Sequence, residues 1–114
     1  MVRIKLYRAR DDGRIYGFHA HGHSGFATSG EDIVCAAVSV LTTVTVLGLQ
    51  ARLGLDPHVA VDEEAGSLDC RLDLDALDAT MSQRTQDLLE TMALGLRDIA
   101  EQHPNHVSVE EVTR

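Results

Sequence analysis

Residues 33–51 constrain the fold of this 114-residue chain most strongly, because no charged residue occurs among them. A stretch of this length and composition is either buried on several sides in a globular domain or crosses a membrane. Polar residues interrupt the stretch, and the charged Glu31 and Asp32 directly precede it. We therefore predict a buried helix of a globular domain and no contact with a membrane.

This helix is predicted over residues 33–53, with Asp32 as its N-cap and Gly54 as the glycine that follows its end. The helix is apolar on nearly every side, as expected where one face packs on a sheet and the other on a further surface. Small residues on it would permit close approach of a second copy of the chain; they are Ala36, Ala37, Ser39 and Gly48. The face of this helix away from the sheet could therefore meet a second copy of the chain.

Alternation of apolar and polar residues predicts two β-hairpins, one on each side of the helix in sequence. The first hairpin joins residues 1–10 to residues 15–22 through an Asp-Gly turn, and the second joins residues 58–62 to residues 67–74. In residues 15–22 a period of two places Tyr16, Phe18 and Ala20 on one face of the strand. His19 and His21 are expected on the other face.

The spacing of apolar residues becomes helical over residues 78–103, and Pro104 ends this pattern. Valines in the tail that follows predict a further short edge strand. The order β-β-α-β-β-α, with this terminal strand, predicts an α+β two-layer sandwich in which two helices cover a mainly antiparallel sheet. The chain length fits a single domain over residues 1–114.

The charge and cysteine content narrow the class of function. A net charge of −8 argues against direct contact with nucleic acid, which needs a basic surface, and favours a basic peptide or protein partner. Two cysteines do not make a disulfide framework, and the N-terminal residues lack the pattern of a signal peptide. We therefore expect a protein of the reducing cytoplasm.

Cys35 is the strongest candidate for a catalytic residue. It falls in the first turn of the predicted helix, where the helix dipole and unpaired N–H groups favour a thiolate. His23 lies upstream, across a glycine-containing loop at residues 24–31 that could fold it back towards the sulfur. The two residues would form a nucleophile and its base, although a lone cysteine on an apolar helix is also common as a packing residue. Cys70 lies within a strand among leucines and is predicted to pack in the core.

Two further residues could support Cys35. Asp32, besides capping the helix, could orient His23 as the third member of a triad. Ser39 lies one helical turn after Cys35 on the same face, where its hydroxyl could bond within the site or to its own helix.

A metal site is the alternative interpretation of the histidines. His19, His21 and His23 alternate along one strand, and with Cys35 they would complete a tetrahedral set for a transition metal. No carboxylate or second cysteine lies at a familiar ligand spacing beside them. We therefore expect no metal and no cofactor, with a histidine-based metal-binding module as the alternative.

One stretch resembles the signature of a known family, the ribosomal-processing cysteine proteases called Prp. Its pattern is G-H…G-x-D-I-V-C-A…S, carried by Gly22, His23, Gly30, Asp32, Ile33, Val34, Cys35, Ala36 and Ser39. The length, acidity and element order of the whole chain are also similar to this family. The resemblance implies a homodimeric cysteine endopeptidase that removes the N-terminal extension of a large-subunit ribosomal protein.

The resemblance also implies roles for particular residues. Cys35 would be the nucleophile and His23 the general base, with supporting positions at Asp32, Ser39, Gly22 and Gly30. The acidic chain would suit the basic N-terminal peptide of a ribosomal-protein precursor. A non-catalytic, ribosome-associated homodimer with a structural Cys35 is the alternative from another class.

Overall fold

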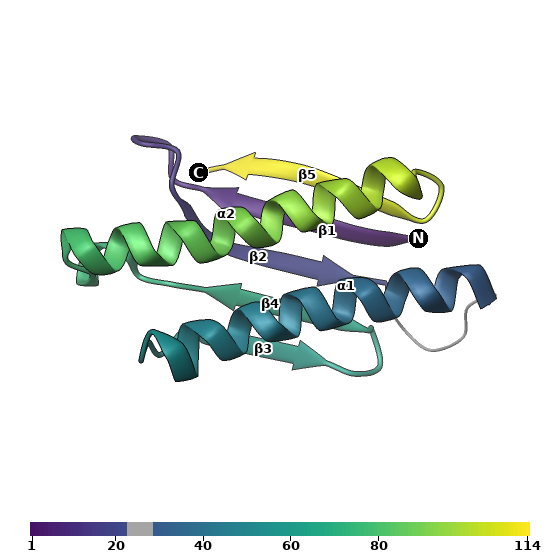
Figure 1. Ribbon diagram of the computed structural model, residues 1–114, viewed down its shortest axis with the longest axis horizontal. Coiled ribbons are helices and arrows are strands. Elements are labelled where there is room, and N and C mark those ends of the chain that lie inside the picture. Colours follow the sequence, from purple (N-terminus) through teal and green to yellow (C-terminus); the bar gives the residue numbers. More distant parts are fainter. Residues whose placement is uncertain (23–28) are drawn as a thin grey trace.

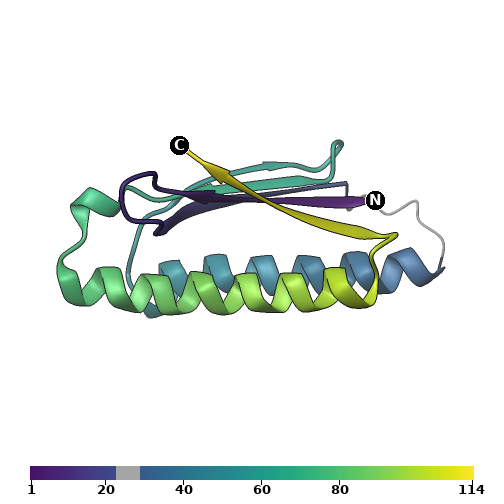
Figure 2. The same cartoon turned by 90° about the horizontal axis from the view of Figure 1, so that it is seen from above.

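The computed structural model describes residues 1–22 and 29–114, and the side chains of residues 29–32 lie outside this description. Within these residues two long helices cover one face of a five-stranded sheet (Figures 1 and 2). The elements are β1 (Val2–Arg8), β2 (Ile15–His21), α1 (Ser29–Leu47), β3 (His58–Asp62), β4 (Ser67–Arg71), α2 (Ala79–Gln102) and β5 (Val107–Thr113). The predicted α+β two-layer architecture is confirmed.

The sheet has the strand order β3-β4-β2-β1-β5. The pairs β1–β2, β2–β4 and β3–β4 are antiparallel, whereas β5 pairs with β1 in parallel. The mainly antiparallel sheet was predicted, and so was an edge strand at the end of the chain. That strand is as long as β1, because it pairs with β1 over its whole length, from Val2 to Arg8.

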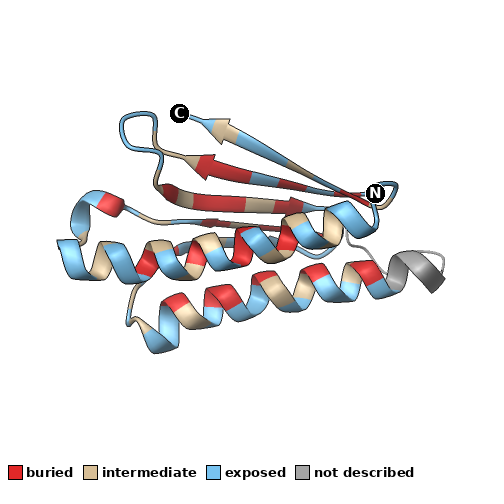
Figure 3. Cartoon of the chain, turned by 45° about the horizontal axis from the view of Figure 1, so that its top comes forward, coloured by how far each residue is buried: buried red, intermediate tan, exposed pale blue. Residues whose placement is uncertain are grey.

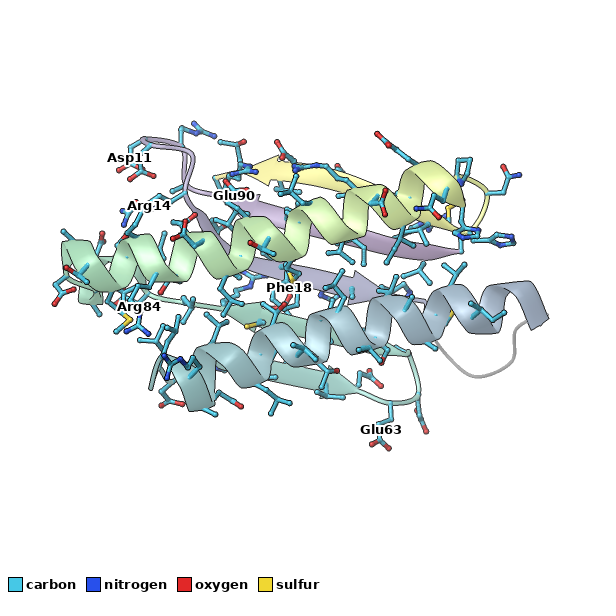
Figure 4. All side chains as sticks on the ribbon, in the orientation of Figure 1. Asp11, Arg14, Phe18, Glu63, Arg84 and Glu90 are labelled. Atoms are coloured by element: carbon cyan, nitrogen blue, oxygen red, sulfur yellow. The ribbon has the colours of Figure 1, made fainter. Side chains whose placement is uncertain are left out.

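The core lies between the sheet and the helices. Alternate residues of the strands point towards the helices, and Figure 3 shows the buried positions concentrated between the two layers. Phe18, at the centre of the molecule in Figure 4, is fully buried. Other fully buried side chains from both layers are Ile4, Leu6, Ile15, Val34, Val38, Leu49, Leu89, Met92 and Leu96.

Tyr16 does not share the face of Phe18, so this part of the strand prediction was wrong. The register between β1 and β2 shifts at this point, which makes Tyr16 the extra residue of a β-bulge and turns Ile15 into the core. The ring of Tyr16 stacks on that of Tyr7, with 5.8 Å between the ring centroids.

Helix α1 begins at Ser29, about one turn earlier than predicted. Asp32 therefore lies inside the first turn, and its prediction as the N-cap was wrong. The expected loop over residues 24–31 ends before Ser29 for the same reason. The predicted C-terminal end is confirmed: a π-helical turn over Gly48–Arg52 continues α1, and Gly54 adopts the left-handed φ of +68° expected after a helix.

The segment Ile33–Arg52 is long and apolar enough to qualify as a candidate membrane span by length and composition alone, a test that a core helix also passes. Val34 and Val38 of this segment are buried against the sheet. On the side away from the sheet its large apolar side chains are exposed; they are Ile33, Val40, Val44 and Leu47. The helix thus packs on the sheet with one face and presents an uncovered apolar face on the other.

Candidate active site

Cys35 lies in the second turn of α1, on the border between the buried and the exposed sides of the helix. Val34 beside it is buried, Ala36 is exposed, and Cys35 itself is half-buried against the core. The effect of a helix dipole falls off within the first turn. The dipole of α1 therefore stabilises a thiolate at Cys35 less than it would stabilise one in the first turn. A nucleophilic Cys35 would therefore depend more on a neighbouring base than the sequence predicted.

Ser39 lies one turn beyond Cys35 and is half-buried like it. On the other flank of the same helix, the side chain of Leu41 lies against Gly95 of α2. Because Leu41 and Cys35 fall on opposite sides of the buried row of α1, the row of Cys35 and Ser39 faces away from α2. The predicted placement of Ser39 on the side of Cys35 is confirmed.

Gly22 determines how the chain leaves β2 towards His23. Its φ is +97°, its N–H donates to the carbonyl oxygen of Gly66 at 3.1 Å, and a Cβ here would lie 2.4 Å from the carbonyl oxygen of Met1. Both the backbone conformation and the close approach of a second backbone thus require glycine. This turn explains why position 22 is a glycine, and the supporting role of Gly22 at the site stays a prediction.

Three predicted site residues fall wholly or partly outside the described residues. His23, together with residues 24–28, is outside the description. Gly30 and Asp32 are described only as backbone of α1. The roles predicted for these residues stay predictions.

The metal set that combined the strand histidines with Cys35 is contradicted. His19 and His21 lie side by side on the open face of the sheet, with 6.3 Å between their ring centroids, whereas α1 covers the opposite face (Figure 2). The sheet therefore separates these two rings from the thiol. Among the described residues, no group of three or more potential ligands is placed to hold a metal ion.

Cys70 is a packing residue, as predicted. It lies in β4 between Phe18 of β2 and Val59 of β3 and is fully buried. Burial, and to a lesser extent the charge of Asp69, raises the pKa of the Cys70 thiol to about 11. The thiol stays protonated at neutral pH and is not available as a nucleophile.

A polar network on the open face of the sheet was not predicted. Asp69 of β4 accepts from Arg71 Nε at 3.0 Å and pairs with His19 Nδ1 at 2.8 Å. The guanidinium of Arg71 also covers the ring of Tyr7, 4.5 Å from its centroid. Burial would raise the pKa of Asp69, but the hydrogen bonds from Arg71 and His19 outweigh it and lower that pKa. The pairing of β2 with both β1 and β4 brings these residues together, and local sequence carries no signal for it.

Comparison with known proteins gives one family and close structural relatives. The model of a family described as "Cysteine protease Prp" matches residues 1–108. A Bacillus subtilis (strain 168) protein named "Ribosomal processing cysteine protease Prp" is 28% identical over 109 residues, which cover 96% of each chain. The family match confirms the resemblance predicted from the sequence.

Two solved structures share the whole fold. SMU.848 from Streptococcus mutans has a TM-score of 0.87 and 28% identity, covering 100% of this chain and 96% of that one. An essential ribosomal processing protease Prp from S. aureus, solved in complex with a substrate peptide, has a TM-score of 0.84 and 21% identity, covering 98% of this chain and 100% of that one. At 21% identity, the similarity to the S. aureus protein shows that the two chains share a fold.

Proposed function

The chain belongs to the cysteine protease Prp family, and from this premise we propose that it removes an N-terminal extension from a large-subunit ribosomal protein. The observation that carries the proposal is the family match over residues 1–108, and the name of the B. subtilis relative, similar over nearly its whole length, supports the substrate class. The net charge of −8 favours encounter with a basic N-terminal peptide.

Cys35 is the proposed nucleophile and His23 the proposed general base. The half-buried position of Cys35 at the edge of α1 supports this role, because a substrate carbonyl can reach the sulfur while the core excludes water on its other side. His23 follows β2 after Gly22, at the end of the strand from which the chain passes to α1. Asp32, in the first turn of α1, would orient His23, and Ser39 would bond within the site.

The proposed reaction is acyl transfer to sulfur. His23 takes the proton of the Cys35 thiol, and the thiolate attacks the scissile carbonyl carbon. Backbone N–H groups near the start of α1 hold the negative charge on the carbonyl oxygen. His23 then protonates the leaving amine, and water hydrolyses the thioester to release the carboxylate and the thiol. A reduced thiol is required throughout, which fits the cytoplasm as the proposed compartment.

Incubation of the purified precursor with variant enzymes tests the nucleophile. We expect Cys35→Ala and His23→Ala to lose cleavage by at least about a thousandfold, as removal of a nucleophile or base does in comparable enzymes. Cys70→Ala makes the same change at the buried thiol, and we expect its cleavage rate to stay within a few fold of the wild-type rate. Equal processing by the wild-type and Cys35→Ala proteins, measured by mass spectrometry of the product, would refute the proposed nucleophile.

We also propose that the chain forms a homodimer through its helical face. The exposed apolar residues of α1 border a groove of about 660 Å³ between the two helices. The groove is lined by Ala36, Ala37, Val40, Leu41, Val44, Gly95, Asp98 and Ile99. An apolar surface of this kind, with small residues that permit close approach, favours burial against a second copy of the same helix pair.

A further inference from the structure

The open face of the sheet carries a cluster of basic and imidazole side chains, which we call the open-face cluster. Arg3 and Lys5 of β1 and His19 and His21 of β2 together line a cavity of about 220 Å³. The strand register places Arg3 opposite His21 and Lys5 opposite His19. The cluster therefore consists of two neighbouring cross-strand pairs, each with one basic side chain and one imidazole.

The positive charge of this cluster is largely uncompensated. In the described part of the chain, neither Arg3 nor Lys5 forms an ion pair, although Glu110 of β5 is the residue opposite Lys5. Asp69 is the carboxylate in contact with the cluster, and its second oxygen is already taken by Arg71. A chain with a net charge of −8 thus has a locally positive, concave site on the face that its helices leave uncovered.

The spacing within the cluster favours a ligand with repeated negative charges. Along a strand, residues on one face are separated by about 6.8 Å, so the two cross-strand pairs offer two adjacent anion sites. His19 is held in place by its hydrogen bond to Asp69, which lowers the cost of ordering this side of the cavity. A single carboxylate would occupy only one of the two pairs, whereas successive phosphates of a polynucleotide strand would occupy both.

We propose that the open-face cluster binds the phosphate groups of a single-stranded polynucleotide backbone. The ligand differs from the proposed protease substrate, because a basic N-terminal peptide would be repelled by Arg3 and Lys5. The proposal departs from the expectation based on net charge, since that expectation averaged the charge over the chain and this cluster concentrates cations on one face. It does not depend on peptide cleavage.

Fluorescence anisotropy of a labelled short oligouridylate in low-salt buffer tests this proposal with the full chain. The Arg3→Gln/Lys5→Gln double variant should bind at least about tenfold more weakly than the wild type. Its plot of log affinity against log salt should be shallower by about 1.4, because each phosphate contact to a single strand contributes about 0.7 to the slope. The matched control is Arg52→Gln/Arg84→Gln, which removes the same charge at exposed positions outside the cluster; Arg84 lies near the start of α2 (Figure 4).

The control and two competitors decide the outcome. Weaker binding by the Arg3→Gln/Lys5→Gln variant, with the control double variant within about twofold of the wild type, would support the proposal. Equal affinities of the two double variants, whether weakened or not, would overturn it. Equally tight competition by oligoglutamate or by inorganic pyrophosphate would also overturn it, in favour of an acidic peptide or a free diphosphate. Thermal unfolding of each variant shows whether it is folded, and perturbation of the His19 and His21 ring signals by the oligouridylate reports binding in the wild type without any substitution.

Discussion

At the scale of single residues, the two cysteines show how position decides reactivity. Cys35 is half-buried on one side of α1, whereas Cys70 is fully buried in β4, between β2 and β3. The thiol of Cys35 is thus partly accessible to solvent. The thiol of Cys70 is buried, and burial raises its pKa to about 11. Their surroundings in sequence already distinguished them: a glycine-containing loop precedes Cys35, and leucines flank Cys70 at alternate positions.

Thiol labelling checks this difference. With iodoacetamide at about pH 8, we expect one label on the native wild-type protein, at Cys35, and a second only after denaturation, since the thiolate is the reactive form. The native Cys35→Ala variant should take up no label, and the Cys70→Ala variant should label as fast as the wild type. Intact-mass spectrometry over time measures the number of labels. Labelling of Cys70 in the native protein at the rate of Cys35 would contradict the assignment.

At the scale of elements, close contact between the helices depends on glycine. Gly95 of α2 leaves room for Leu41 of α1, and a Cβ at position 95 would lie 2.7 Å from a terminal carbon of Leu41. A glycine inside a helix costs about 1 kcal/mol relative to alanine, so its presence here indicates that packing outweighs helix propensity. The same contact sets the floor of the groove between α1 and α2.

The effect of substituting Gly95 on the free energy of unfolding should therefore change sign when Leu41 is also substituted. We expect Gly95→Ala to lower the free energy of unfolding by about 1 kcal/mol, because overpacking costs about 1–3 kcal/mol and the gain in helix propensity offsets part of it. In a Leu41→Ala background the clash is absent, and the same substitution should stabilise the protein by up to about 1 kcal/mol. Urea denaturation of the four proteins in this cycle gives both values. Stabilisation by Gly95→Ala in the wild-type background would show that Leu41 moves aside without cost.

At the scale of the whole molecule, the two faces of the sandwich have opposite character. The helical face is apolar, with Val40 62% exposed, and the open sheet face is polar and carries the basic cluster. A dimer through the helices would leave the open face accessible, because both helices lie on the other side of the sheet. The proposed dimer and the proposed polynucleotide site therefore use different surfaces.

One charge on the helical face should separate the dimer into monomers. We expect Val40→Glu to raise the dissociation constant by at least about tenfold, because two copies of the charge would be buried in one interface. Ala60→Glu, at an exposed residue of the edge strand β3 that pairs with Asp69 of the open face, introduces the same charge away from the helices and should leave the dimer intact. Analytical ultracentrifugation over a concentration series measures both. A monomeric wild-type protein at high concentration would contradict the proposed dimer.

The sequence by itself determined the elements, their order and most of their ends. Asp78 caps α2 by accepting from the N–H of Met81 at 2.8 Å, Gly54 ends the first helix, and β3 has the predicted bounds. The candidacy of Cys35 and Ser39 also followed from sequence, through their spacing on one side of a helix. These features depend on residues only a few positions apart, because helix caps, turns and hydrophobic periodicity are local properties of the sequence.

Only the tertiary structure decided the start of α1, the bulge at Tyr16 and the partners of His19. Asp69 lies far from His19 in sequence and meets it only because β4 pairs with β2 in one register. The strand histidines lie away from Cys35 because Phe18 and Ala20, on the other face of β2, are buried under the helices. Local sequence does not determine which strands pair or in which register. The free energy that selects a register comes from burying the faces of several strands and helices at once.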